Sequence, residues 1–389
     1  MMKFIIIGLG YVGLSLSVFL GKNHTVIGVD TNDSKLKAIS EGVSPINDTD
    51  ISRVLRSKTL DFQVTNNLNS VIDDTVDAFI ITVPTDGLLG EGILDTSIVD
   101  SVVKQILAFK PNAFIIIRST VPIGHTQRLN NMYHTKEIIF SPEFIREGVS
   151  YNDNLYPSRI IVGDRDSQNK WFGNLLLEET TIKDSPVMHM GTSEAEAVKL
   201  FSNSYLAMRV AFFNELDTFA NSKKLDTENI IKGVSLDSRI GNYYNNPSFG
   251  FGGYCLPKDS MELISEFDGI PNALISSINL SNEARINYIV SEITTKNPTV
   301  VGVYKLAMKM FSDNYRTSSI MKVITNLIRR GLTIVVFDDN YQESSIVGVQ
   351  KINNFDMFIE ISDIIISNRK YEELSTVSNL YTRDIFNRD

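Results

Sequence analysis

The chain's one cysteine, Cys255, lies in the glycine-rich stretch "GFGGYCLPKD", residues 250–259. A lone cysteine is often a small buried hydrophobe with no reactivity. Glycine-rich backbone, however, gives up side-chain packing and lets another molecule approach closely. A thiol held there is accessible, and an accessible thiolate is a nucleophile. We therefore predict that Cys255 does covalent chemistry, and a packed, inert thiol is the alternative.

A second glycine pattern follows the apolar run "KFIII" at the N-terminus, where Gly8, Gly10 and Gly13 form G-x-G-x-x-G. The first glycine allows a tight turn, the second lets a pyrophosphate approach the backbone, and the third lets a helix pack closely on a strand. The amides at the start of that helix then face the anion. This pattern predicts a dinucleotide site.

Asp30 ends the next apolar run, "TVIGVD", near the spacing expected for a carboxylate that binds the adenosine ribose hydroxyls. Such a carboxylate repels a 2'-phosphate, so we expect NAD rather than NADP. The alternative role for Asp30 is an aspartate that ends a strand or caps a helix.

A thiol beside NAD suits a reaction in which an alcohol is oxidised twice, because an aldehyde donates a second hydride only after a nucleophile has added to it. The oxyanion formed needs fixed donors. Lys199 and Asn203 lie four residues apart on one helix face and fit this role, although a solvated or interdomain polar patch is the alternative. Three carboxylates could position a base or water: Glu143, Glu147 and Asp259.

The elements that must hold these groups alternate between strand-like and helical runs. Strands are expected at "KFIII", "TVIGVD", "DAFIITVPT", "NAFIIIRST", "EIIFSPE" and "SRIIVGD". This pattern is typical of an α/β fold with a Rossmann-like doubly wound parallel sheet. A second, smaller α/β alternation starts at "NPTVVGVYK". We expect three regions: an NAD-binding domain at 1–192, a central helical region at 193–296, and a second α/β domain at 297–389.

A long helix is expected between these sheets, from about Glu194 to Ser222, because the run contains neither glycine nor proline. Ser193 and Glu196 form a capping-box pattern at its start. Its faces are apolar nearly all round, so we predict that it is buried as a spine between domains and in a homodimer interface.

The composition, with a net charge of −9, argues against a nucleic-acid binder. One cysteine cannot form an internal disulfide, and the four histidines lack metal-ligand spacing, so no metal site is expected. The apolar N-terminus contains spaced glycines that fit strand, turn and helix better than a signal or membrane segment. We expect a cytoplasmic protein that does not bind membranes.

Six motifs carry a resemblance over essentially the whole chain: "GLGYVGLSLS", "VPTD", "STVPIG", "SPEFIREG", "EAVKLFSNSYLAMRVAFFNEL" and "GFGGYCLPKD". In this order they resemble the UDP-glucose/GDP-mannose dehydrogenase family. The resemblance implies a homodimer that oxidises UDP-glucose to UDP-glucuronate with NAD, in four electrons. It also implies that 193–296 is the central helical dimerisation and active-site region and that 297–389 is the UDP-sugar-binding domain. A dehydrogenase of UDP-N-acetylmannosamine or GDP-mannose is a close alternative, and a non-catalytic NAD-binding scaffold is a more distant one.

The same resemblance implies roles for single residues. Cys255 would be the nucleophile, assisted by Lys199, Asn203 and Asp259, with Glu147 and Thr120 at the nicotinamide and water side. The NAD site would further include Tyr11, Val12, Asp30, Lys35, Thr85, Tyr254 and Lys258. The sugar nucleotide would contact Glu143, Phe144, Ile145, Arg146, Glu147, Tyr244, Asn245, Asn246, Pro247, Ser248 and Gly252. Arg239 would reach the substrate of the partner subunit.

One element departs from the family pattern. Where many relatives have K-x-x-T-x-D-x-R, this chain has Lys309, Ser312, Asn314 and Arg316, so the acidic position is replaced although Asp313 is adjacent. By the resemblance, Lys309 would contact substrate and Arg316 the cofactor, and surface cations are the alternative. The resemblance also suggests Arg383, in "YTRD", as a uridine contact.

Overall fold

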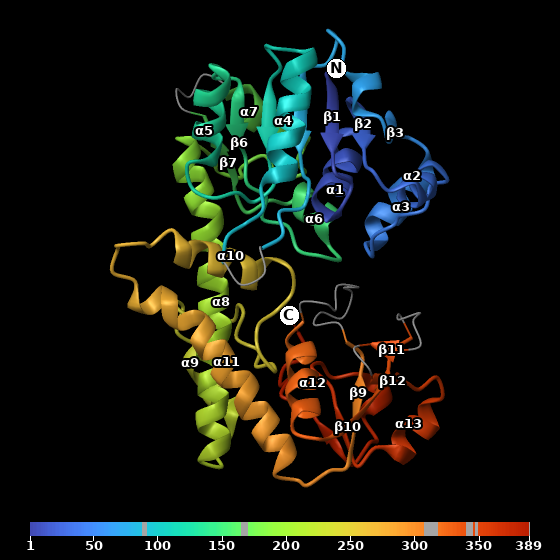
Figure 1. Cartoon of the computed structure of the whole chain (residues 1–389), viewed down its shortest axis with the longest axis vertical. Coiled ribbons are helices and arrows are strands. Elements are labelled where there is room, and N and C mark those ends of the chain that lie inside the picture. The colour runs from blue at the N-terminus through green and yellow to red at the C-terminus, as the bar shows by residue number, and fades with distance from the viewer. Residues whose placement is uncertain (88–91, 165–169, 307–317, 340–344, 347–348, 389) are drawn as a thin grey trace. The chain divides into compact units, whose positions relative to one another are not determined.

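We analysed a computed structural model of the chain, which describes residues 1–87, 92–164, 170–306, 318–339, 345–346 and 349–388. It divides into two compact units, residues 1–202 and 203–389. The division falls inside one helix, α8 (Thr192–Ser222) (Figure 1). The expected three-region division at 192 and 296 stays a prediction.

The first unit is built on an eight-stranded sheet of order β3-β2-β1-β4-β5-β6-β7-β8. Among the described strands, β6 and β7 pair antiparallel and the other neighbours are parallel, so one joint departs from the expected parallel sheet. The sequence analysis missed β3 and β8, because "FQVT" and "VMHM" lack a continuous apolar run. The strands are β1 (Lys3–Ile7), β2 (Thr25–Val29), β3 (Phe62–Thr65), β4 (Ala78–Ile81), β5 (Ile115–Ile117), β6 (Ile138–Phe140), β7 (Ile160–Gly163) and β8 (Val187–Met190).

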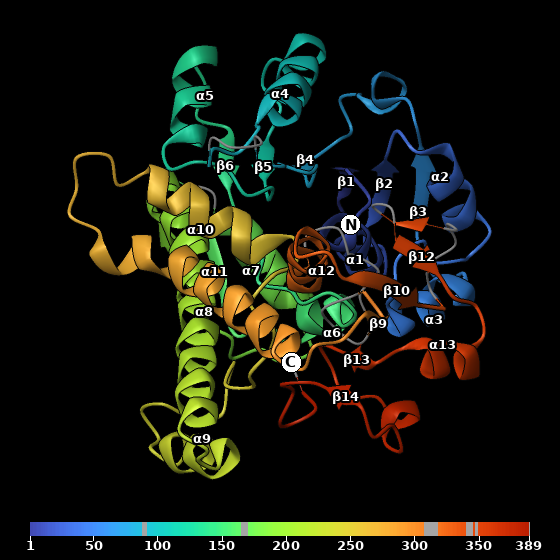
Figure 2. The ribbon, with the colours of Figure 1, turned by 60° about the horizontal axis from the view of Figure 1, so that its bottom comes forward.

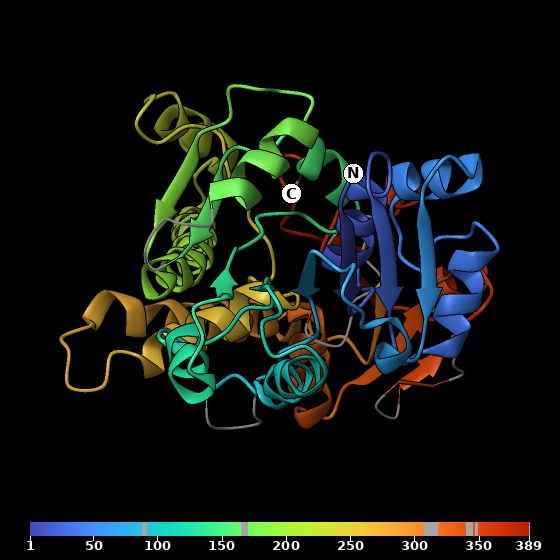
Figure 3. The same ribbon diagram turned by 90° about the horizontal axis from the view of Figure 1, so that it is seen from above.

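Helices lie on both faces of this sheet (Figure 3). Alternate residues of β1 show the reason: Phe4 and Ile6 belong to one buried cluster, Ile5 and Ile7 to another. Successive strand residues point to opposite faces, so both faces need a cover. The helices are α1 (Tyr11–Leu20), α2 (Asp33–Ser40), α3 (Thr49–Ser57), α4 (Ser97–Phe109), α5 (His125–Tyr133), α6 (Ser150–Leu155) and α7 (Lys170–Glu179), with a short 3-10 helix, η1 (Leu68–Val71).

The long helix was predicted correctly, but its predicted cap was wrong. Helix α8 begins at Thr192, so Ser193 lies inside it. The carboxylate of Glu196 accepts hydrogen bonds from the backbone N–H groups of Gly124 (2.6 Å) and Thr126 (2.9 Å). Glu196 therefore satisfies amides at the start of α5, a tertiary contact that the local pattern did not show.

The second unit combines helices with a six-stranded sheet of order β11-β12-β10-β9-β13-β14 (Figure 2). Apolar residues of α11 and α12 pack on one face of the sheet, and Phe358 of α13 packs on the other. Strands β11 and β12 were not predicted. The elements are α9 (Thr227–Ser235), α10 (Cys255–Ser265), α11 (Ala273–Thr294), β9 (Val300–Tyr304), α12 (Ser319–Arg329), β10 (Thr333–Phe337), β11 (Ser345–Ile346), β12 (Val349–Lys351), α13 (Phe355–Ile361), β13 (Ile364–Ile366), η2 (Glu372–Leu374) and β14 (Leu380–Tyr381).

No helix in the described ranges combines the length and the apolar composition that crossing a membrane requires.

A buried charge cluster ties α8, α11 and the C-terminal segment together within the second unit. The Asp217 carboxylate, fully buried, accepts from Arg285 Nη2 (2.6 Å) and Arg383 Nε (2.9 Å). Burial raises the pKa of Asp217, but the hydrogen bonds and charges of Arg383 and Arg285 outweigh it, so the pKa lies below its ordinary value. Asp217 is therefore ionised at neutral pH, and Arg383 forms an ion pair with it.

We expect Asp217→Asn to lower the free energy of unfolding by about 3 to 5 kcal/mol at neutral pH, because it leaves two arginines without their buried counter-charge. The folded pKa of Asp217 is lowered, so its stabilisation is present above the unfolded pKa and is lost as pH falls through the folded value. Denaturant unfolding at neutral and acid pH measures this. If the difference in unfolding free energy between wild type and variant does not become smaller in acid, Asp217 is not the ionised group described above.

Candidate active site

The glycine turn after β1 forms an open backbone surface at the carboxyl edge of the first sheet. Gly8 has a φ of +95°, which L side chains rarely adopt, and a Cβ on Gly13 would lie 1.8 Å from the carbonyl oxygen of Gly8. A Cβ on Gly10, by contrast, would meet no atom within 4 Å. Gly8 and Gly13 are thus required by the fold, whereas Gly10 leaves space beside the first turn of α1, where Tyr11 and Val12 lie. This space fits a dinucleotide pyrophosphate.

The Asp30 carboxylate follows β2 and lies beside this turn. It accepts from the backbone N–H of Leu9 (2.8 Å), from the N–H of Asn32 (3.0 Å) and from Lys35 Nζ (2.8 Å). Burial raises the pKa of Asp30, but these hydrogen bonds outweigh it and the pKa lies below its ordinary value. An ionised carboxylate next to the glycine turn fits the adenosine ribose of NAD.

The other predicted residues of the first unit follow β4, β5 and β6 at the same edge. Thr85 and Thr120 are buried, and Glu143–Glu147 follow β6 directly. Because the carboxyl ends of parallel strands meet at one edge, the sheet brings the predicted nicotinamide-side residues to the edge that carries the glycine turn.

Glu143 and Lys199 form a buried ion pair. Lys199 Nζ lies 2.6 Å from Glu143 Oε1 and 2.7 Å from the Glu143 carbonyl oxygen, and Oε2 accepts from the N–H of Ile145. Burial raises the pKa of Glu143, but Lys199, the Ile145 N–H and Arg118 together lower it below its ordinary value. Glu143 therefore carries its charge at neutral pH and fixes the Lys199 side chain.

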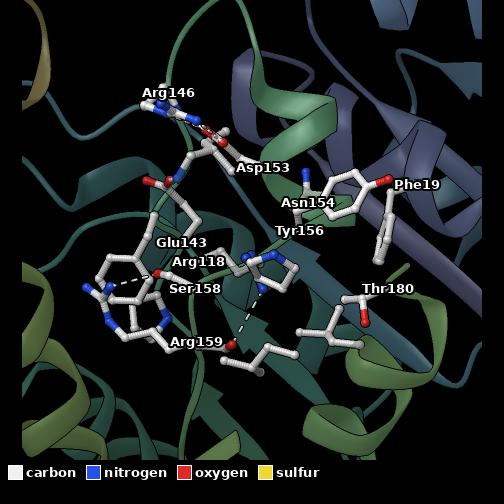
Figure 4. A pocket seen from close by; sticks show the side chains of 17 residues that line it. Phe19, Arg118, Glu143, Arg146, Asp153, Asn154, Tyr156, Ser158, Arg159 and Thr180 are labelled. Atoms are coloured by element: carbon white, nitrogen blue, oxygen red, sulfur yellow. Dashed lines mark hydrogen bonds and ion pairs between the residues drawn. The ribbon is translucent and has the colours of Figure 1, made fainter. Parts of the chain in front are cut away.

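A cavity of about 250 Å³ lies behind this segment (Figure 4). Two arginines that the sequence analysis missed line it. Arg118 is buried near Glu143, and burial lowers its pKa to about 10 although Glu143 opposes the shift. The Arg159 guanidinium carbon lies 3.6 Å from the centre of the Phe144 ring, a cation–π contact that holds the segment after β6. A charged residue after the apolar run "FIII" was the available signal for Arg118.

Arg146 belongs to the same segment and also lines the cavity. Its guanidinium pairs with Asp153 at 2.6 Å and is exposed. Three side chains of the segment 143–147 therefore contact different partners. Glu143 pairs with Lys199, Phe144 lies under the Arg159 guanidinium, and Arg146 pairs with Asp153.

Cys255 is the first residue of α10 in the second unit and is partly exposed. Asp259, one turn later on the same helix, is fully buried, and its Oδ2 accepts from Asn203 Nδ2 at 2.5 Å. Lys258 Nζ lies 3.0 Å from Asp259 Oδ1 and 4.9 Å from the centre of the Tyr254 ring. The second unit thus brings together Cys255, Asp259 and Asn203 as well as the residues predicted to contact NAD, Tyr254 and Lys258.

Lys199 and Asn203 are successive-turn neighbours on α8, with side chains that are 3% and 9% exposed. Each is hydrogen-bonded to a buried carboxylate, Glu143 and Asp259 respectively. Neither is a solvated surface residue, which was one alternative for this pair.

The predicted substrate loop, residues 244–248, has an unusual start. Tyr244 has a φ of 50°, rare for a bulky residue, and such strain concentrates at functional sites. Residues 245–248 are buried, and the Ser248 N–H donates to Asn214 Oδ1 at 2.8 Å. Gly252 lies between this loop and Cys255. Arg239, in contrast, is exposed and forms an ion pair with the nearby Asp237 at 2.6 Å. Lys309 and Arg316 lie outside the described residues.

We expect Gly10→Ala to weaken NAD binding by at least about tenfold, because the added methyl group would occupy the space proposed for the pyrophosphate. The melting temperature should stay unchanged, because the methyl group would meet no atom of the protein. Gly13→Ala is the contrasting variant, which should lower the melting temperature as well. Calorimetric titration with NAD and thermal unfolding measure both. Wild-type NAD affinity in Gly10→Ala would contradict the assignment of the pyrophosphate to this turn.

Comparisons with known proteins agree with this architecture. The NAD binding domain of the UDP-glucose/GDP-mannose dehydrogenase family matches residues 2–180, and the central domain of that family matches residues 193–284. The cofactor of the first unit is therefore NAD.

Full-length relatives extend the likeness to the whole chain. The chain is 41% identical to a UDP-glucose 6-dehydrogenase of Streptococcus pneumoniae and 39% identical to one of Campylobacter jejuni, covering 100% of each. A solved structure of a UDP-glucose dehydrogenase from Pyrobaculum islandicum, 25% identical, matches with a TM-score of 0.88 over 99% of this chain and 94% of that one. This chain belongs to the UDP-glucose/GDP-mannose dehydrogenase family.

Proposed function

We propose that the chain is an NAD-dependent UDP-glucose 6-dehydrogenase that converts UDP-glucose to UDP-glucuronate. The observation that carries the proposal is Cys255 at the start of α10, partly exposed and one turn before a buried Asp259 that Asn203 holds. The full-length likeness to enzymes named UDP-glucose 6-dehydrogenase supports the choice of substrate.

Cys255 acts after the sugar alcohol has become an aldehyde. Its thiolate adds to the aldehyde carbon and forms a thiohemiacetal, and the helix N-terminus favours the anionic sulfur. Oxidation of the thiohemiacetal gives a thioester, which water cleaves to release the carboxylate and the thiol. NAD, when bound, accepts one hydride in each of the two oxidations.

The oxyanion that forms at the sugar carbon needs donors that are already in place. Lys199 and Asn203 are proposed for this role, because both are buried and oriented by carboxylates. Asp259 orients Asn203, and Glu147 and Thr120 hold the water that hydrolyses the thioester. Glu143 orients Lys199 through its carboxylate and its carbonyl oxygen.

The remaining predicted contacts complete the two ligand sites of the proposal. NAD is held by Gly8, Gly10, Tyr11, Val12, Gly13, Asp30, Lys35, Thr85, Tyr254, Lys258 and Arg316. The nucleotide sugar is held by the segments 143–147 and 244–248, by Gly252 and by Lys309. A cytoplasmic location is part of the same proposal.

We expect Cys255→Ser to reduce formation of the acid at least about a thousandfold while NAD affinity stays near wild type, because the hydroxyl is a much weaker nucleophile. The measurement is NADH released per substrate consumed, with UDP-glucose, UDP-N-acetylmannosamine and GDP-mannose offered in turn. The proposal requires two NADH per UDP-glucose in the wild type. One NADH, preference for another sugar nucleotide, or full activity of the variant would refute it.

A homodimer through α8 is also part of the proposal. Tyr205, Phe212 and Phe219 recur every seven residues on α8 and are 54%, 57% and 58% exposed. Residues seven apart form one seam along a helix, and an aromatic seam of this kind fits a second copy of the same helix. The exposed Arg239 would then reach the substrate of the partner subunit.

We expect Phe212→Glu to convert the dimer to a monomer and to reduce activity with it, because the charge is placed in the apolar seam. Phe109→Glu is a matched control, since Phe109 is 58% exposed but lies on α4. Light scattering coupled to size-exclusion chromatography gives the mass of each variant. A Phe212→Glu protein with unchanged mass would exclude this interface.

A further inference from the structure

The C-terminal segment 384–388 holds the predicted substrate loop through the side chain of Asn246. Asn246 Nδ2 donates to Asp384 Oδ1 (2.7 Å) and to the Arg388 carbonyl (2.6 Å). Its Oδ1 accepts from the backbone N–H groups of Ile385 (3.0 Å) and Phe386 (3.1 Å). A carboxamide offers two donor hydrogens and two acceptor positions, so all four are used. Asn246 therefore has no side-chain hydrogen bond left for a ligand.

The neighbouring asparagine makes a parallel contact. Asn245 Oδ1 accepts from Arg388 Nη2 (2.9 Å), and its amide group donates to Ser235 Oγ (2.8 Å). Asn245 and Asn246 are 1% and 8% exposed. Both side chains point to groups of the protein, so any contact of this loop with a nucleotide sugar uses the backbone or the residues beside them.

The segment 384–388 is itself anchored on the second sheet. Asp384 Oδ2 accepts from the Lys370 N–H (3.0 Å), and the Arg388 carbonyl accepts from Arg369 Nη1 (2.9 Å). Just before the segment, Arg383 pairs with the buried Asp217. The segment is therefore a fixed support rather than a loose end.

The other end of the loop is held by helices. The Ser248 N–H donates to Asn214 Oδ1 of α8, and the Ser248 carbonyl accepts from Arg285 Nε of α11 (2.9 Å). Between this end and the strained Tyr244, only the contacts of Asn245 and Asn246 tie the loop to the C-terminal segment in the described residues. Loss of these contacts leaves buried polar groups unpaired, and the loop must move to hydrate them.

We infer that Asp384–Arg388 is a positioning element that fixes loop 244–248 in its nucleotide-sugar-binding conformation, with Asn246 as the residue through which it acts. This inference rests on the proposed function, because it takes the loop to be part of the UDP-glucose site.

The test is Asn246→Asp, which places a carboxylate against that of Asp384 and removes both donors. We expect the KM for UDP-glucose and the Kd for UDP, measured by calorimetry, to rise at least about tenfold. The KM for NAD should change by less than about threefold, because no residue proposed to hold NAD lies in the loop 244–248. The kcat at saturating UDP-glucose should change equally little, because the loop contains none of the proposed catalytic residues. Asn130→Asp is the matched control: Asn130 is 9% exposed and pairs with both backbone groups of Ile138. It should lower the melting temperature and leave both nucleotide-sugar constants unchanged.

Exchanging the carboxylate and the amide between positions 246 and 384 distinguishes a positioning role from a general loss of stability. Asp384→Asn alone should also raise the Kd for UDP, because Asp384 accepts from Asn246 with one oxygen and from the Lys370 N–H with the other, and asparagine has only one acceptor oxygen. The double variant Asn246→Asp with Asp384→Asn should recover part of the affinity, because the new amide at 384 can donate to the new carboxylate at 246. If Asn246→Asp does not fold, the Kd for UDP of Asp384→Asn and of the double variant tests the inference instead. Folded variants that bind UDP as the wild type does would overturn the inference. A wild type that neither binds UDP nor oxidises UDP-glucose would instead overturn the proposed function.

Discussion

The need to satisfy buried polar groups along α8 constrains most of the candidate site. Several side chains of this helix are hydrogen-bonded inside the protein, among them Lys199 to Glu143, Asn203 to Asp259, and Asp217 to Arg285 and Arg383. An unpaired charge or amide at these depths costs several kcal/mol. Each contact therefore fixes a different segment against the helix: the segment after β6, the start of α10, and the C-terminal segment.

The same contacts set the charge states of two buried carboxylates. Glu143 and Asp217 are both deeply buried, and burial alone would raise the pKa of each. In both cases cationic partners reverse the effect, so the carboxylates stay ionised at neutral pH. The Glu143 carboxylate accepts from Lys199 Nζ and orients that side chain, and the proposed oxyanion role would need such a fixed donor. The contact between Lys199 and Glu143 thus both orients the lysine side chain and lowers the pKa of the carboxyl group.

The local sequence predicted the parts of the fold that depend on short-range physics. The apolar run and the glycine pattern at the N-terminus predicted β1, the turn and α1, because the steric demands at Gly8 and Gly13 are local to one strand–turn–helix unit. The run after residue 191 contains neither glycine nor proline up to residue 222, and it predicted α8 because helix formation also depends on local backbone preferences. Strands β3 and β8 were missed because their hydrogen-bonded neighbours, rather than an apolar run of their own, define them.

The sequence by itself determined the family and the glycine turn between β1 and α1, since each is carried by residue types at fixed spacing. Only the tertiary structure decided the partners of buried polar groups, because partners such as Asn246 and Asp384 are 138 residues apart and no periodicity links them. Glu196 shows the same limit: its spacing from Ser193 suggested a local cap, whereas its hydrogen bonds go to α5. A side chain's type says that it needs a partner, and only the folded chain says which one it finds.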